Sequence, residues 1–186
     1  MRRKAELRSP QGLSAPARRV LGSAMPAPIL PLIEAAKAWP PRGALLGLDL
    51  GTKTIGVAVA DADRRVAAAV ETIQRTTFTK DAARLLSLAD ERKVVGIVLG
   101  LPLNMDGSEG PRAQATRAFA RNLARISALP IGLWDERLST AAVERQLIDA
   151  DVSRAKRAKS IDQHAAVFIL QGALDRLRGL PTTGDT

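Results

Sequence analysis

The fold of this chain is decided by one stretch, Leu45-Leu46-Gly47-Leu48-Asp49-Leu50-Gly51-Thr52-Lys53-Thr54-Ile55-Gly56-Val57-Ala58-Val59-Ala60-Asp61. Two apolar runs, 44–50 and 54–60, flank the turn 51–53, which predicts two strands joined by a tight connection. Asp49 stands at the end of the first run, where a buried strand should reach the surface. An acid beside a core strand costs free energy unless it is paired or binds a cation. Asp49 therefore either caps the turn or faces a metal ion or a phosphate.

The regular pattern continues to residue 178 and alternates strands with helices. The expected strands are 44–50, 54–60, 65–73, 94–99 and 130–134, and the expected helices are 80–92, 112–128, one from Ser139 or Thr140 to about 150, and 160–178. Three sequential strands with short turns predict an antiparallel meander. The unbroken apolar run 94–99 is typical of a strand covered on both faces. We therefore expect an α/β fold with a five-stranded mixed sheet, an antiparallel meander and then parallel strands, flanked by helices.

The first 43 residues are predicted to lie outside this domain as a Pro/Ala/Arg-rich, largely disordered extension. They contain seven of the eleven prolines, a composition that cannot build a packed core. Within them, residues 29–36 have an amphipathic pattern that could form a helix docked on the domain. The domain is expected over 44–179, and 180–186 is expected to be a disordered tail.

The net charge of +9 favours a polyanionic partner such as nucleic acid. Part of this charge lies in residues 1–24, which we expect to be a basic arm, a transit peptide or a segment that precedes a native start at Met25. They hold six basic residues and one acid, so they carry +5 of this charge and leave +4 for the other 162 residues. Nucleic-acid binding by the domain must therefore rest on local clusters of basic residues.

The sequence lacks cysteine and lacks a long apolar segment, and both observations limit the possible compartment and chemistry of the protein. The chain has no cysteine, which excludes disulfides, thiolate zinc sites and cysteine nucleophiles and fits a reducing compartment. No segment approaches the ~20 uninterrupted apolar residues of a membrane span. We therefore expect a soluble protein of the cytoplasm with no membrane partner.

Three acids have positions that would bring them to one edge of the sheet. Asp49 ends the first strand, Glu136 follows the last strand, and Asp162 lies in the first turn of the final helix. Ala165 and Ala166 are small and apolar, so Asp162 shares the helix face that packs on the sheet. Two carboxylates ~4 Å apart repel by roughly 4 kcal/mol at an effective dielectric of about 20. Three that converge therefore need a proton or a cation, and oxygen ligands suit Mg²⁺ or Mn²⁺, which activate water for phosphodiester hydrolysis. Three that do not converge would be unrelated capping or ion-pairing acids.

Basic residues next to these acids are candidates for nucleic-acid binding. The candidates are Lys53, Arg137, Arg154, Lys156, Arg157 and Lys159. The last four lie in 153–159, which is expected to be a linker before the final helix. Four positive charges beside an acidic site are typical of contacts to a phosphate backbone, although a solvated linker would have the same composition.

Four motifs together resemble a known family. They are Gly47-Leu48-Asp49-Leu50-Gly51-Thr52-Lys53, Gly100-Leu101-Pro102 with Asn104 and Gly107, Asp135-Glu136-Arg137-Leu138-Ser139-Thr140, and Ile161-Asp162 with Ala165-Ala166. In this order and spacing the chain resembles the YqgF, or RuvX, family of Holliday-junction-resolvase-like proteins with the RNase H fold. The resemblance implies a metal-dependent nuclease of pre-16S rRNA, acting at the 5′ end, with Holliday junctions also proposed as substrates. It assigns Asp49, Glu136 and Asp162 as the acidic triad that binds the metal and catalyses the reaction.

The chain departs from the resolvase pattern at one position. Resolvases of this fold carry an acid at the end of the fourth strand, where this chain has Gly100-Leu101-Pro102. The resemblance therefore implies that Glu136, after the fifth strand, takes that role. A fourth ligand could come from Asp135, or from Asp106 or Glu109 in the loop 100–111.

Two other functions are compatible with parts of the pattern. ATPases and sugar kinases use a similar Asp-x-Gly-Thr hairpin around ATP phosphates, but one domain over 44–179 cannot supply their two lobes. A non-catalytic RNA-binding factor of ribosome assembly would keep the acids as structural residues. The prediction is a nuclease of structured nucleic acid, pre-16S rRNA first and a DNA junction second, acting as a monomer or homodimer.

Overall fold

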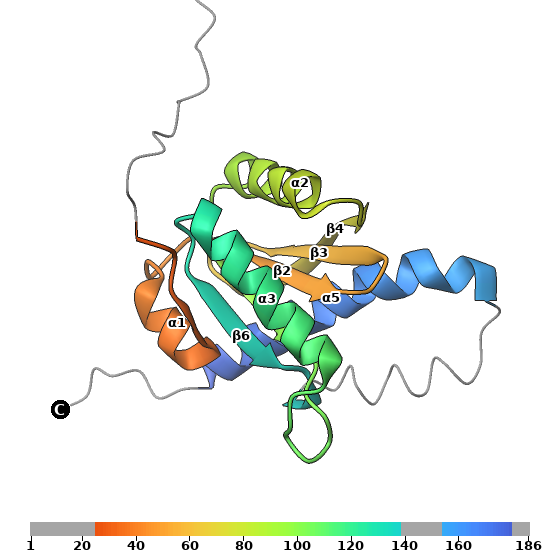
Figure 1. The fold of residues 1–186 in the computed structure, drawn as a ribbon. Coiled ribbons are helices and arrows are strands. Elements are labelled where there is room, and N and C mark those ends of the chain that lie inside the picture. The colour runs from red at the N-terminus through yellow and green to blue at the C-terminus, as the bar shows by residue number, and fades with distance from the viewer. Residues whose placement is uncertain (1–24, 139–153, 180–186) are drawn as a thin grey trace, which may run out of the picture.

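The computed structural model describes residues 25–138 and 154–179, with only the backbone described for 154–163. Its sheet has six strands in the order β1-β6-β5-β2-β3-β4 (Figure 1). The strands are β1 (Ile29–Pro31), β2 (Ala44–Leu50), β3 (Thr54–Ala60), β4 (Ala67–Gln74), β5 (Val94–Leu101) and β6 (Ile131–Asp135). β2, β3 and β4 form the predicted antiparallel meander, β5 runs parallel to β2, and β6 runs parallel to β5. The predicted mixed α/β sheet is confirmed, with one strand more than expected.

The hairpin of β2 and β3 has the bounds that the sequence predicts. Leu48 pairs with Val57 across the two strands, and Gly51 N donates a hydrogen bond of 2.9 Å to Thr54 O, which closes the turn. Both strands are buried on both faces because helices cover the sheet from either side. The two apolar runs that predicted this hairpin reflect the burial of both faces of its strands.

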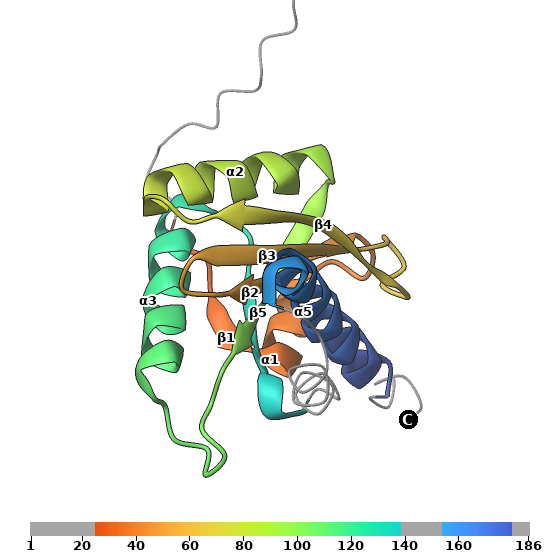
Figure 2. The same cartoon turned by 90° about the vertical axis from the view of Figure 1, so that its right-hand side faces the viewer.

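Helices form one layer on each face of the sheet (Figure 2). α2 (Phe78–Glu91) and α3 (Pro111–Ile126) pack on one face, and α1 (Leu32–Ala38) and α5 (Arg154–Arg178) pack on the other. In the described parts of the chain, no helix is both long enough and apolar enough to cross a membrane.

The last predicted helix starts earlier than expected. Residues 154–159 were assigned to a linker, and this is wrong because α5 begins at Arg154. The segment has two alanines and no glycine or proline, so its intrinsic helix propensity is high. The helix predicted from Ser139 or Thr140 to about 150 lies outside the described residues.

Part of the predicted N-terminal extension belongs to the domain, which corrects the boundary at residue 44. Ile29–Pro31 pairs in parallel with Ile131–Leu133 of β6, so the helix expected over 29–36 begins only at Leu32. Proline lacks a backbone donor and is tolerated on an edge strand and before a helix. Residues 1–24 and 180–186, for which disorder was predicted, lie outside the described residues.

Trp39, which follows α1, fixes this N-terminal segment to the sheet. Its indole lies over β5, where a Cβ at Gly96 would be 2.0 Å from Trp39 Nε1. Trp39 Nε1 also donates a hydrogen bond of 3.1 Å to Pro130 O. A glycine in β5 therefore makes room for a tryptophan from a segment that composition alone assigns to an extension.

Replacing Trp39 should weaken the domain. Trp39→Phe removes the hydrogen bond to Pro130 O and should lower the free energy of unfolding by about 1 kcal/mol beyond the loss of ring volume. Trp134→Phe is a matched control, because the buried Nε1 of Trp134 has no hydrogen-bond partner within the described residues. Urea unfolding measures both variants. A loss for Trp39→Phe no larger than that for Trp134→Phe would contradict the assignment.

Candidate active site

Asp49 lies near the end of β2, on the sheet face that α5 covers. Side chains alternate along β2, so Leu48 packs under α2 and α3 while Leu45 packs under α5. Gly47 faces α5 as Leu45 does, because a Cβ at Gly47 would lie 2.6 Å from the Cβ of Leu170 in α5. Asp49 is the next residue on this face and is half-buried. The strand therefore presents its one carboxylate at the edge of an apolar interface.

The carboxylate of Glu136 lies over Gly100, near the end of β5. Glu136 begins the 3-10 turn η1 (Glu136–Leu138) directly after β6, and it is 9% exposed. A Cβ at Gly100 would lie 2.6 Å from Glu136 Oε1 and 2.5 Å from Ile169 Cδ1 of α5. The glycine thus leaves the space that the carboxylate occupies. An acid from the turn after the neighbouring strand β6 therefore lies over the strand end where the sequence comparison with resolvases leads one to expect an acid.

Asp49 and Glu136 lie on the same face of the sheet, on neighbouring strand ends. β2 pairs with β5 up to Leu48 opposite Leu99, so Asp49 and Gly100 are the next neighbours along the two strands. Adjacent strands are about 4.8 Å apart, and residues in register point to the same face. The Glu136 carboxylate therefore lies over the residue next to Asp49 on the neighbouring strand, on the same sheet face. The structure brings these two predicted site residues together.

The backbone of Asp162 comes over the same end of the sheet. Gln171 Oε1 accepts a hydrogen bond of 2.9 Å from Ala67 N, which is level with the start of β2 across the sheet. Residues earlier in α5 lie over later residues of β2, so the helix runs antiparallel to that strand. Ala166 O lies 3.2 Å from a Cβ at Gly47. Asp162 precedes Ala166 by about one helical turn, which is about 6 Å along the helix axis. Asp49 follows Gly47 by roughly 6.6 Å along β2, so the backbone of Asp162 is level with Asp49. The side chain of Asp162 lies outside the described residues.

The donor set at this edge fits a hard divalent cation. Among the side chains that the structure describes, no three acids, histidines or cysteines form a metal site, and the third predicted acid is not among them. Asp49 and Glu136 supply carboxylate oxygens on one sheet face, one half-buried and one buried. Two carboxylates close together repel each other, and a cation with oxygen preference, Mg²⁺ or Mn²⁺, would relieve that repulsion.

Arg137 and Asp135 form an ion pair on either side of Glu136. Arg137 Nη2 lies 2.6 Å from Asp135 Oδ2, and the Arg137 backbone N donates to Asp135 Oδ1 at 3.0 Å. Arg137 Nη1 also donates to Met105 O at 3.3 Å. The hydrogen bond from Arg137 lowers the pKa of Asp135. Arg137, predicted to contact phosphate, and Asp135, considered as a fourth ligand, thus contact each other and hold the turn that carries Glu136.

This ion pair should make stability depend on pH. Because the pKa of Asp135 is lower in the folded chain, the pair stabilises the fold above the ordinary aspartate value of about 3.9. That contribution disappears as the pH falls through the lowered pKa. Wild-type protein should therefore be more stable than Asp135→Asn near neutral pH, and the difference should shrink as the pH falls through the lowered pKa of Asp135. Urea unfolding over a series of acidic pH values measures it, and a constant difference would contradict the pairing.

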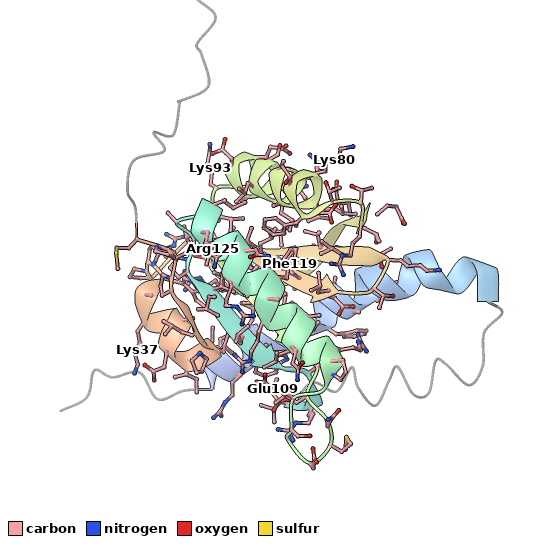
Figure 3. All side chains as sticks on the ribbon, viewed as in Figure 1. Lys37, Lys80, Lys93, Glu109, Phe119 and Arg125 are labelled. Carbon is pink, nitrogen blue, oxygen red and sulfur yellow. The ribbon has the colours of Figure 1, made fainter. Side chains whose placement is uncertain are left out.

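The loop between β5 and α3 uses its own acids for internal bonds. Asp106 Oδ1 accepts hydrogen bonds from Ser108 Oγ at 2.6 Å and Ser108 N at 2.9 Å. Glu109, labelled at the start of α3 in Figure 3, accepts a hydrogen bond of 2.6 Å from Arg117 Nε. These hydrogen bonds lower the pKa of both carboxyls. Both acids considered as loop-derived ligands are therefore held in ordered contacts within the loop and with α3.

The other basic candidates lie at the same end of the molecule. Lys53 is in the turn between β2 and β3, four residues after Asp49. The residues Arg154, Lys156, Arg157 and Lys159 fall in the first turns of α5, which extend beyond the end of β2 (Figure 1). Their side chains lie outside the described residues, so only their position on this helix is assigned. The sequence did not reveal that Gly100 leaves the space for the Glu136 carboxylate. It showed only that an acid is lacking at 100–102, where resolvases of this fold carry one.

Comparison with solved structures finds resolvases of low sequence identity. T. thermophilus RuvC in complex with a Holliday junction substrate has a TM-score of 0.47 and 11% identity, covering 74% of this chain and 97% of that chain. The fowlpox virus Holliday junction resolvase has a TM-score of 0.43 and 14% identity, covering 74% and 99%.

Comparison with curated proteins finds relatives of high identity. A protein of Rhodopseudomonas palustris (strain BisA53) is 81% identical over 153 residues, which are 82% of this chain and 94% of the relative. One of Bradyrhizobium sp. (strain BTAi1) is 77% identical over 160 residues, or 86% and 99%. Both are named "Putative pre-16S rRNA nuclease". The model of the RuvX family, described as Holliday junction resolvase, matches residues 43–176. The chain therefore belongs to the RuvX family and is a nuclease that hydrolyses phosphodiester bonds.

Proposed function

We propose that this chain is a divalent-metal-dependent nuclease that processes the 5′ end of pre-16S rRNA in the cytoplasm. The observation that carries the proposal is the buried Glu136 carboxylate over Gly100, on the same sheet face as Asp49. Two acids so placed favour a cation-dependent reaction over a purely structural role. The pre-16S rRNA substrate follows the name of the relatives of 76–81% identity.

Each residue of the site has a separate task in this proposal. Asp49, Glu136 and Asp162 would hold Mg²⁺ or Mn²⁺, which when bound activates water and neutralises the leaving oxygen. β2 and η1 position Asp49 and Glu136 on rigid backbone, so little reorganisation is needed when substrate binds. Lys53 and the basic first turns of α5, with Arg137 at the rim, would contact the phosphate backbone on either side of the acids.

The description of the matching family favours one second substrate. A Holliday junction has a phosphate backbone of the same charge, so the same acids and bases would serve it. Symmetric resolution of a junction needs two active sites and hence a homodimer, whereas processing one RNA end needs only a monomer. The two proposals therefore differ in substrate and in oligomeric state.

Cleavage assays with both substrates test the proposal. We expect a 5′-labelled precursor 16S rRNA fragment to be cut in Mg²⁺ or Mn²⁺ and left intact in EDTA, while a labelled four-way DNA junction is cut more slowly. Cleavage of the RNA in EDTA would contradict metal dependence. Preferential cutting of the junction by a homodimer would replace RNA with DNA as the substrate. An uncut RNA that is nevertheless bound would favour a non-catalytic assembly factor.

A further inference from the structure

Arg75 lies beside the turn that follows Asp49, although no motif of the sequence analysis includes it. It comes directly after β4, is exposed, and its Nη1 donates a hydrogen bond of 2.6 Å to Gly51 O. Its backbone N donates to Lys53 O at 2.9 Å, which continues the β3–β4 ladder by one residue. The guanidinium is thus tied to backbone only two residues from Asp49.

Arg75 and Lys53 bring two positive charges to this turn. Among the described residues, no carboxylate forms an ion pair with either of them. Two acids near this end of β4 are engaged elsewhere, since Glu71 pairs with Arg84 and Asp81 accepts a hydrogen bond from Thr76 N at 3.1 Å. Like charges opposite each other on paired strands are unfavourable. An anionic ligand would remove that cost.

The chemistry of the Arg75 side chain favours a phosphate group as this ligand. Guanidinium has five N–H donors in a planar fork, and the bond to Gly51 O uses one of them. The remaining donors can bind two phosphate oxygens at once, and the bond to Gly51 orders the side chain before substrate arrives. Lys53 would add a second, more mobile charge on the other side of the same turn.

We propose that Arg75 binds a backbone phosphate of the nucleic-acid strand that crosses the active site, on the side of the β2–β3 turn. This rests on the proposed nuclease function, and it assigns the strand a path from the first turns of α5, across Asp49, to Arg75. Arg75 does not touch the scissile phosphate. It fixes the register of the strand, so its loss should weaken substrate binding much more than it slows the chemical step.

Binding measured in a cleavage-deficient background tests this assignment. With Asp49→Asn present in all proteins, Arg75→Gln should weaken binding of the labelled precursor RNA about 3–10-fold and reduce the slope of log K against log salt by about one. Arg75→Lys should keep most of the slope. Arg125→Gln is the matched control, because Arg125 lies at the far end of α3 from Glu109 (Figure 3), and it should leave both quantities unchanged.

Steady-state kinetics of proteins that retain Asp49 distinguish substrate binding by Arg75 from a purely structural role of this residue. Arg75→Gln should raise KM with kcat within about twofold. An unchanged salt slope, with a lower kcat and a lower melting temperature, would overturn the proposal and make Arg75 a support of the Gly51 turn. If wild-type protein cuts no substrate, the nuclease function fails, while the salt slope still reports whether Arg75 binds phosphate.

Discussion

Asp49→Asn should abolish cleavage while the protein stays folded and binds RNA. The amide removes one negative charge from the cation-binding group at the end of β2, but it has nearly the same shape as the carboxylate. The rate should fall by at least about 10²–10³-fold, as for loss of one electrostatic group that stabilises a transition state. Single-turnover cleavage of labelled precursor RNA in Mg²⁺ measures this. The melting temperature of the variant, measured in parallel, should show that it is folded at the assay temperature.

Asp63→Asn is the matched control for this variant. Asp63 lies in the turn between β3 and β4, at the opposite end of the hairpin, and pairs with Arg42 on the surface. Its replacement should leave cleavage unchanged. Full activity of Asp49→Asn would exclude the proposed chemistry. Loss of biological function with RNA binding retained would exclude the alternative of a non-catalytic assembly factor.

Gly100→Ala should remove most of the activity without replacing any acid. The new Cβ would lie 2.6 Å from Glu136 Oε1, closer than any stable contact, so the carboxylate must move. A shift of about 1 Å in a catalytic group can cost roughly 10²-fold in rate. Crowding of Ile169 Cδ1 should also lower the free energy of unfolding by about 1–3 kcal/mol. Cleavage kinetics and urea unfolding on the same preparation separate these two effects.

Gly132→Ala distinguishes displacement of Glu136 from general crowding. A Cβ at Gly132 would lie 3.1 Å from the Cβ of Ala35, under α1 and away from the acids. This variant should lose some stability but keep its activity when assayed below its melting temperature. If Gly100→Ala cleaves RNA as fast as Gly132→Ala does, Gly100 is not the cradle of an active carboxylate.

Local signals in the sequence were sufficient for the central part of the fold. The hairpin around Asp49 is specified by two apolar runs and a short turn, information held within 17 residues. α2 and α3 were predicted within two residues at each end, because their apolar spacing reflects the faces they bury. These features depend on neighbouring residues, which a single sequence records directly.

Contacts between distant residues could not be predicted in the same way. The docking of Trp39 on Gly96 and Pro130 joins segments that are far apart in the chain. It places β1 and α1 in the domain, although composition alone predicts that the domain begins at residue 44. The space that Gly100 leaves for Glu136 is likewise a property of two strands in register. The ion pair of Arg137 with Asp135 was hidden because a basic residue beside acids also matches a phosphate contact.

The central claim is that Asp49, Glu136 and Asp162 hold one cation site between β2, η1 and α5. Anomalous diffraction from crystals of the full chain soaked in Mn²⁺ tests it most directly. We predict a manganese peak about 2.0–2.3 Å from carboxylate oxygens of all three residues, and no peak there in Asp49→Asn. Manganese bound elsewhere, or the Asp162 carboxylate directed away from Asp49 and Glu136, would contradict the account.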